Sequence, residues 1–213
     1  MMTVNKDRLA RDAGEWRNTT IAVEAFKKSR SQPQDVAIYL EDEPDATYGA
    51  IAEEALRLIA ALRGLGLSAG DVISFQFPNW REGAVVDIAA AALGLVVNPI
   101  VPIYRDAELR FILSDAESKL ILIPDQHRSI DYVNMISRLR PELPSLEHVV
   151  TLRASDEYPN TIRYEQLIDC EPADESSLPV IDPNSIKCRL YTSGTTGFPK
   201  AVLHSHNTLT RIL

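Results

Sequence analysis

The chain has 213 residues, which is enough for one substantial hydrophobic core or two smaller ones. Its 30 acidic and 22 basic residues give a net charge of −8, which argues against nucleic acid or an anionic membrane as a partner. Its two cysteines, Cys170 and Cys188, are too few for a disulfide framework, and no stretch resembles a membrane span or a secretory signal, so we expect a cytoplasmic protein.

Segments with the periodicity of strands and of helices alternate along the first part of the chain. The sequence predicts strands at Val36–Leu40, Val72–Phe77, Val96–Ile100, Leu120–Ile123 and His148–Leu152. Val96–Ile100 and Leu120–Ile123 are short apolar runs that suit buried parallel strands. Apolar residues at helical spacing predict helices over residues 20–30, from Thr47 to Gly64 or Gly66, and over Arg81–Leu93, Asp106–Ser114 and Ile130–Arg140. Thr20 and Thr47 are the expected N-caps of the first two helices. This alternation implies an α/β fold with a mostly parallel sheet flanked by helices.

The rest of the chain is expected to form two further parts. Residues 169–185 are acidic and contain prolines and serines, so we expect a linker-like loop after an N-terminal α/β subdomain of residues 1–168. Residues 186–213 would form an incomplete second part, in which Ile186–Tyr191 is a strand and Asn207 caps the start of a helix.

The most informative segment, residues 191–200, reads Tyr-Thr-Ser-Gly-Thr-Thr-Gly-Phe-Pro-Lys. Glycines let backbone N–H groups approach an anion closely, and successive N–H groups in such a turn form a concave anion site. A lysine adds a mobile positive charge at the rim of that site. This combination favours a polyphosphate ligand. The candidate phosphate-binding residues are Thr192, Ser193, Gly194, Thr195, Thr196, Gly197 and Lys200.

The spacing distinguishes this segment from other phosphate-binding motifs. The P-loop of the common NTPases has adjacent Gly and Lys followed by Ser or Thr, whereas here Pro199 precedes Lys200 and Ala201 follows it. No G-x-G-x-x-G sequence follows a predicted strand. His204 and His206 are two residues apart, but zinc needs three or four ligands, so we expect no metal site within the chain.

The segment YTSGTTGFPKAVLHSHN resembles the phosphate-loop motif of the adenylate-forming superfamily, which includes acyl-CoA synthetases, aryl-acid ligases, luciferases and peptide-synthetase adenylation domains. Residues 46–79 and 90–125 resemble two core blocks of that family, so the resemblance covers roughly residues 16–125 and 186–210. Ala201 departs from the family's usual glycine. The residues that are more similar to acyl-CoA and aryl-acid ligases than to peptide-synthetase domains are Asn98-Pro99-Ile100, Pro102, Tyr104, Arg105 and Glu108-Leu109.

The resemblance implies an ATP-dependent acid–thiol ligase, which activates a small-molecule carboxylic acid as an acyl-adenylate and passes the acyl group to a thiol. The implied cofactors are ATP and Mg²⁺, with coenzyme A as co-substrate. Residues 192–197 and Lys200 would hold the β- and γ-phosphates. The family's magnesium-binding glutamate, adenine pocket and catalytic lysine match nothing in this sequence, so no catalytic residue is assigned.

Family members are well over twice this length, so we expect the chain to be an N-terminal fragment, truncated after the phosphate loop and inactive by itself. Its sheet would end in an uncovered edge, which favours self-association. The alternative is a non-catalytic remnant, or one half of a split ligase that acts as an assembly module. A nucleotide-binding module unrelated to ligation conflicts with the two upstream blocks. The sequence leaves the acid and the acceptor thiol open.

Overall fold

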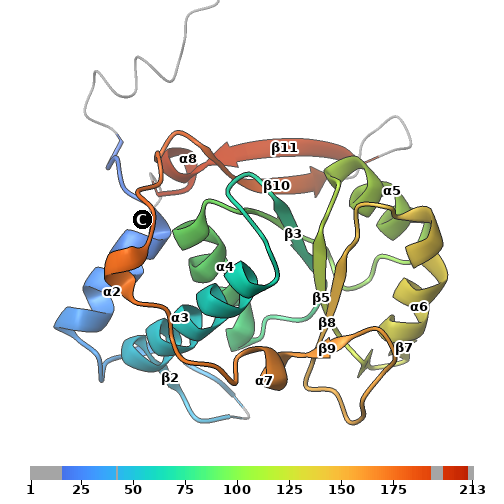
Figure 1. Cartoon of the computed structure of the whole chain (residues 1–213), viewed down its shortest axis with the longest axis horizontal. Helices are drawn as coiled ribbons and strands as arrows, with labels where there is room; N and C mark the ends of the chain where they lie inside the picture. The colour runs from blue at the N-terminus through green and yellow to red at the C-terminus, as the bar shows by residue number, and fades with distance from the viewer. Residues whose placement is uncertain (1–15, 42, 193–198, 211–213) are drawn as a thin grey trace, which may run out of the picture.

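A seven-stranded sheet forms the centre of the computed structural model, which describes residues 16–41, 43–192 and 199–210 (Figure 1). Its strands are β3 (Val72–Phe75), β4 (Val96–Pro99), β5 (Leu120–Pro124), β8 (His148–Leu152), β9 (Ile162–Arg163), β10 (Ile186–Thr192) and β11 (Lys200–Ser205). Their order across the sheet is β11-β10-β4-β3-β5-β8-β9. Neighbouring strands are parallel except β10 and β11, which are antiparallel.

Helices and two small strand pairs surround this sheet. The helices are α2 (Ile21–Ser31), α3 (Tyr48–Gly64), α4 (Arg81–Leu93), α5 (Asp106–Ala116), α6 (Tyr132–Leu139), α7 (Tyr164–Leu167) and α8 (His206–Thr210). The small pairs are β1 (Val36–Ile38) with β2 (Ala46–Thr47), and β6 (Gln126–His127) with β7 (Ile130–Asp131). None of the helices in the described part of the chain is long and apolar enough to cross a membrane.

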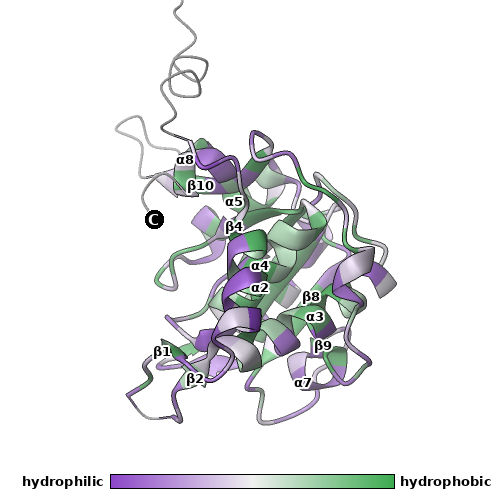
Figure 2. Ribbon diagram, turned by 90° about the vertical axis from the view of Figure 1, so that its left-hand side faces the viewer, coloured by the Kyte–Doolittle hydropathy of each residue, from purple (hydrophilic) through white to green (hydrophobic). Residues whose placement is uncertain are grey.

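Helices cover both faces of the sheet, and each face has its own hydrophobic core (Figure 1). Helices α2, α3 and α4 supply one core, and α5 and α6 supply the other. Strand β5 serves both, because Leu120 and Leu122 point into the first core while Ile121 and Ile123 point into the second. All of β5 is buried, as expected of a parallel strand covered on both faces. Figure 2 shows the central strands as largely hydrophobic, with hydrophilic residues on the outer helices and loops.

The predicted α/β architecture is confirmed, and so are most positions of its elements. The segments Arg81–Leu93 and His148–Leu152 are α4 and β8, residue for residue. The side chains of Thr20 and Thr47 each accept a hydrogen bond from the backbone N–H three residues later, at 3.3 and 3.2 Å. Both residues are therefore N-caps, as predicted, and each satisfies a donor that the first helical turn leaves unpaired.

The helix predicted from Ile130 to Arg140 begins later than expected. Ile130 and Asp131 form β7, and α6 starts at Tyr132. Asp131 determines this boundary, because its Oδ1 accepts a hydrogen bond from the Asn134 N–H at 2.8 Å and so acts as the N-cap. The periodicity of the apolar residues predicted the helix correctly, but it did not reveal that Asp131 is its N-cap.

The prediction that Asn207 caps a helix is wrong. Helix α8 begins at His206, and the cap is Ser205, whose Oγ accepts a hydrogen bond from the Thr208 N–H at 3.2 Å. The preceding residues form β11, a strand that the sequence analysis did not predict. The chain from Lys200 onward therefore runs back along β10 before it becomes helical.

Residues 169–185, which we call the strap, run along α3 and are tied to it. Arg57 Nη1 donates a hydrogen bond to the backbone oxygen of Cys170 at 2.6 Å, and Arg63 Nη2 donates to that of Ser177 at 3.1 Å. The strap leads from β9, at one edge of the sheet, to β10 in the other half. The sheet thus contains strands that precede the strap in the sequence and strands that follow it. The predicted division into a subdomain that ends at residue 168 and a second part that begins at residue 186 stays a prediction.

Strand β11 is the outermost strand on its side of the sheet among the described residues. Two neighbouring apolar side chains, Val202 and Leu203, point to opposite faces of β11, and they are 41% and 49% exposed. In the described structure β11 is therefore uncovered on both faces. Self-association at this edge stays a prediction.

Gly94 ends α4 in the left-handed conformation, with a φ of +70°, and this generates a stability prediction. A Cβ at this position would lie 3.0 Å from Ile181 Cδ1 and 3.2 Å from Ala69 Cβ. We expect Gly94→Ala to lower the free energy of unfolding by about 1–2 kcal/mol, because it adds left-handed strain at a crowded site. Urea unfolding measures this change. Gly64→Ala is the matched control, since a Cβ at this helical glycine meets no atom within 4 Å. Equal destabilisation by both substitutions would contradict this explanation.

Candidate functional site

The carboxyl ends of the parallel strands lie at one edge of the sheet, which we call the carboxyl edge. In open α/β sheets, ligands bind in the crevice outside these strand ends. Cys188 in β10 is the register partner of Val97 in β4, so counting along the two strands places Tyr191 level with Ile100. The segment predicted to bind phosphate, residues 191–200, therefore starts at the carboxyl edge, beside the connection that follows β4.

Strands β10 and β11 form a hairpin, and the candidate phosphate-binding residues lie at its two strand ends and in the sequence between them. Thr192 ends β10 and Lys200 begins β11, and the two residues are register partners. Thr192 Oγ1 donates a hydrogen bond to the Lys200 backbone oxygen at 3.5 Å. The structure thus brings together two of the seven candidate residues, both of them exposed, at the base of the tip. The other five, residues 193–197, lie outside the described residues.

The residue before the tip is attached to helix α5. The side chain of Tyr191 is buried, and its hydroxyl donates a hydrogen bond to the Asp115 carboxylate at the end of α5. Arg189 Nη1 donates to the Asp115 backbone oxygen at 2.8 Å. Burial, followed by the hydrogen bond to Asp115, raises the pKa of Tyr191 to about 12. The phenol therefore remains a protonated donor at neutral pH.

Two side chains hold the connection after β4, residues 100–105. Gln76 Nε2 donates hydrogen bonds to two backbone oxygens of this connection at 3.1 and 3.0 Å, and Tyr132 OH donates to the Pro102 oxygen at 3.0 Å. Val101 and Ile103 are 45% and 69% exposed. The hairpin is therefore flanked at the carboxyl edge by a fixed connection with exposed apolar side chains.

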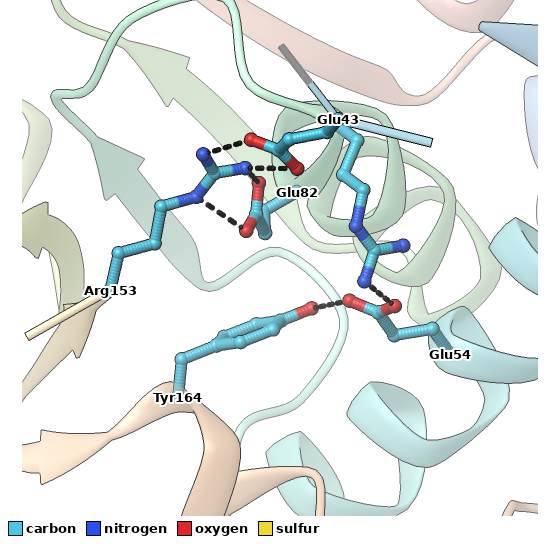
Figure 3. A network of polar contacts seen from close by, with 6 residues as sticks. Glu43, Glu54, Glu82, Arg153 and Tyr164 are labelled. Carbon is cyan, nitrogen blue, oxygen red and sulfur yellow. Dashed lines mark hydrogen bonds and ion pairs between the residues drawn. The ribbon is translucent and has the colours of Figure 1, made fainter. Parts of the chain in front are cut away.

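The half of the carboxyl edge away from the hairpin carries a charged network (Figure 3). Arg153, which follows β8, donates from Nε and Nη2 to the two carboxylate oxygens of Glu82, both at 2.9 Å, and also pairs with Glu43. Its guanidinium lies 4.3 Å from the centre of the Trp80 ring. Arginine suits this position, because its planar fork binds a carboxylate with two hydrogen bonds and stacks on an aromatic ring. The network joins the ends of β3 and β8 to α4.

Comparison with protein families identifies the chain. Residues 25–213 match the model of a family described as AMP-binding enzyme. The chain belongs to the AMP-binding enzyme family. The match includes the hairpin and the whole seven-stranded sheet, so the resemblance of the phosphate-loop motif is confirmed at the level of the family.

The relatives of this member of the AMP-binding enzyme family include ligases named for fatty and aryl acids. It is 29% identical to a medium-chain fatty-acid–CoA ligase of Escherichia coli, over 98% of this chain and 37% of the relative. It is 29% identical to a salicyl-AMP ligase of Mycobacterium tuberculosis, over 94% of this chain and 36% of that relative. It is 32% identical to a long-chain-fatty-acid–CoA ligase of Thermus thermophilus, over 76% of this chain and 28% of that relative. The chain therefore spans about a third of the length of these relatives.

Solved structures of longer chains share the fold. Apo MbtA of Mycobacterium smegmatis superposes with a TM-score of 0.83 at 24% identity, over 99% of this chain and 38% of that one. The anthranilate CoA ligase AuaEII, in complex with anthranoyl-AMP, superposes with a TM-score of 0.81 at 21% identity, over 89% of this chain and 35% of that one. At these identities the likeness shows the fold, and the sheet with its two helical layers corresponds to about a third of each of these longer chains.

The base of the hairpin is a buried polar junction that the sequence analysis missed. Lys187 of β10 is 3% exposed and pairs with Asp87 of α4. His206 is 1% exposed, and neither of its ring nitrogens has a hydrogen-bond partner among the described residues. The Asn207 N–H donates to the Pro183 oxygen at 2.9 Å, which joins α8 to the strap. The only sequence signal for this junction was the Ser-His-Asn run that ends the family-like motif.

His206 gives the protein a predicted sensitivity to acid. Burial lowers the pKa of His206 to about 4, and the charge of Lys187 acts in the same direction, against a weaker opposing effect of Asp87 and Asp182. The unfolded chain takes up a proton on this residue near pH 6.5, whereas the folded chain keeps it neutral down to about pH 4. We expect the free energy of unfolding to fall by roughly 1–3 kcal/mol as the pH drops between these values.

Urea unfolding at a series of pH values measures this effect, and a pair of histidine variants assigns it. His206→Phe should flatten the profile between about pH 6.5 and pH 4, because the titrating group is removed. His204→Phe changes a neighbouring, less buried histidine on β11 and should leave the slope in place. A slope that persists in His206→Phe would show that other groups cause it.

Proposed function

We propose that this chain is the phosphate-binding part of an ATP-dependent acid–thiol ligase, which activates a carboxylate as an acyl-adenylate and transfers the acyl group to a thiol. The hairpin is the observation that carries the proposal. A Gly- and Thr-rich tip connects Thr192 to Lys200 at the carboxyl edge of an AMP-binding fold. A site at this edge has the position that open α/β sheets use for ligands.

We assign phosphate binding to Thr192, Lys200 and residues 193–197. The strand pairing of Thr192 with Lys200 supports this, since it places a hydroxyl and an ammonium group on the two sides of one tip. Displacement at phosphorus depends mainly on positioning and electrostatic stabilisation, and Lys200 would neutralise part of the charge on the β- and γ-phosphates. Bound magnesium would add Lewis-acid stabilisation at the same phosphates. The protein ligand of this magnesium ion is proposed to lie in other polypeptide, because the family's magnesium-binding glutamate matches nothing in this sequence.

The proposed substrate is a fatty or aryl carboxylic acid, with coenzyme A as the acceptor. The names of the relatives support this class, since they include ligases for medium-chain fatty acids, long-chain fatty acids and salicylate. The complete reaction is proposed to need polypeptide beyond these 213 residues, because the chain spans only about a third of those relatives. A cytoplasmic location belongs to the same proposal. Among the described residues, no feature favours a non-catalytic remnant over this function.

Lys200→Ala tests the phosphate assignment. We expect it to weaken the affinity for Mg·ATP by roughly ten- to a hundredfold, because one charge-assisted hydrogen bond is worth about 1.5–3 kcal/mol. Titration calorimetry on the purified chain, or its thermal shift in millimolar Mg·ATP, measures the change. Lys27→Ala removes an exposed lysine of α2 and serves as the matched control. The assignment fails if Lys200→Ala binds Mg·ATP as tightly as the parent chain.

The purified chain is expected to release no pyrophosphate from ATP when medium-chain fatty acid or salicylate is supplied. The reason is that the family's catalytic lysine and magnesium-binding glutamate have no counterpart in its sequence. A coupled pyrophosphate assay measures this, with the Escherichia coli medium-chain fatty-acid–CoA ligase as the positive control. Turnover by the chain alone would contradict the expectation. Binding of Mg·ATP without turnover would agree with a phosphate-binding part, and the absence of both would favour a remnant.

A further inference from the structure

The attachment of the hairpin to the rest of the sheet is uneven along β10. The register between β10 and β4 contains one pair, Cys188 with Val97, whereas the pairing between β10 and β11 continues to Thr192 and Lys200. Beyond Cys188, the hairpin therefore has no ladder pairing to β4 in the described register. Its other strand, β11, is the outermost of the sheet. Side chains must therefore hold the end of the hairpin that carries the proposed phosphate contacts.

Tyr191 supplies the apolar part of this attachment. Its side chain is 9% exposed and belongs to the core formed by α5 and α6. Its ring packs edge-on against Phe111 of α5, with the ring centres 6.4 Å apart and the planes at 87°. Edge-to-face packing at this separation is favourable and restricts the orientation of the ring. The residue directly before Thr192 is therefore fixed against α5.

Polar contacts complete the attachment at the carboxyl end of α5. The Tyr191 hydroxyl donates to Asp115 Oδ2. Arg189, which points to the same side of β10, donates from Nη1 to the Asp115 backbone oxygen at 2.8 Å and to the Tyr191 hydroxyl oxygen at 3.4 Å. Its charge also favours the end of a helix, where backbone oxygens are left unpaired. The three residues thus close a ring of contacts between β10 and α5.

We infer that Tyr191, Asp115 and Arg189 form a pin that positions Thr192 and Lys200 for phosphate binding. The inference rests on the proposed function. The pin fixes the residue next to Thr192, and strand pairing passes the constraint to Lys200. Helix α5 is then a supporting element of the proposed nucleotide site. The members of the pin are positioning residues, because they act through Thr192 and Lys200.

Tyr191→Phe tests the pin, because it removes the hydroxyl and keeps the buried ring. We expect it to weaken the affinity for Mg·ATP roughly three- to tenfold, the effect of one lost hydrogen bond. Asp115→Asn keeps an oxygen that can accept from Tyr191 and should stay close to the parent chain. Tyr158→Phe is the matched control, since Tyr158 also donates to an aspartate, Asp125, at 3.3 Å, and it lies between β8 and β9, at the other edge of the sheet from the hairpin. Its affinity for Mg·ATP should equal that of the parent chain.

Amide hydrogen exchange without nucleotide provides a second measurement on the same variants. Peptides that contain Thr192 and Lys200 should exchange faster in Tyr191→Phe than in the parent chain, and at the parent rate in Tyr158→Phe. Unchanged affinity and unchanged exchange in Tyr191→Phe would overturn the pin, even if Lys200→Ala weakens binding. If Lys200→Ala has no effect, the proposed function fails, and the exchange rates alone decide whether the pin holds the hairpin.

Discussion

The burial of the parallel strands on both faces is the constraint on which this fold depends. A strand covered by helices on two sides can pair its backbone polar groups only with neighbouring strands, so the ladder fixes its position. In β5, Leu120 and Ile121 face different cores, and a shift of one residue would exchange every side chain between them. The register that follows places the connections after β3, β4, β8 and β10 at one edge. The candidate site is a consequence of that alignment.

The sequence predicted those elements whose signals are local. Helix α4 is one example, since its apolar residues recur along Arg81–Leu93 and Gly94 supplies the left-handed residue that ends it. The N-caps Thr20 and Thr47 are others. The short strands could not be predicted in this way. Strand β9 has two residues, Ile162 and Arg163, and its identity as a strand depends on pairing with β8, which no local pattern records.

The candidate site shows the same division between local and distant information. The motif predicts Thr192 and Lys200 as phosphate contacts because their chemistry and spacing lie within one short segment, and this assignment stays a prediction. The contacts that hold the hairpin could not be found in this way, since Tyr191 is 76 residues from Asp115 in the sequence. Lys187 and Asp87 are 100 residues apart, and nothing in the sequence suggested that they would form a buried pair. Two helices on different faces of the sheet bring these partners to the hairpin. Helix α5 carries Asp115 on one face, and α4 carries Asp87 on the other.

The path of the strap has a consequence for the order in which the protein folds. Strand β10 meets β4 only after the chain has formed β9 and crossed the helical layer, and the paired residues Val97 and Cys188 lie about 90 residues apart. Closing so long a loop costs conformational entropy that only the finished contact repays, whereas β3, β4 and β5 meet through much shorter connections. We therefore expect the hairpin to dock onto a sheet that has already formed. The proposed nucleotide site would then be the last part to assemble, and a bound nucleotide would mark a chain whose sheet is complete.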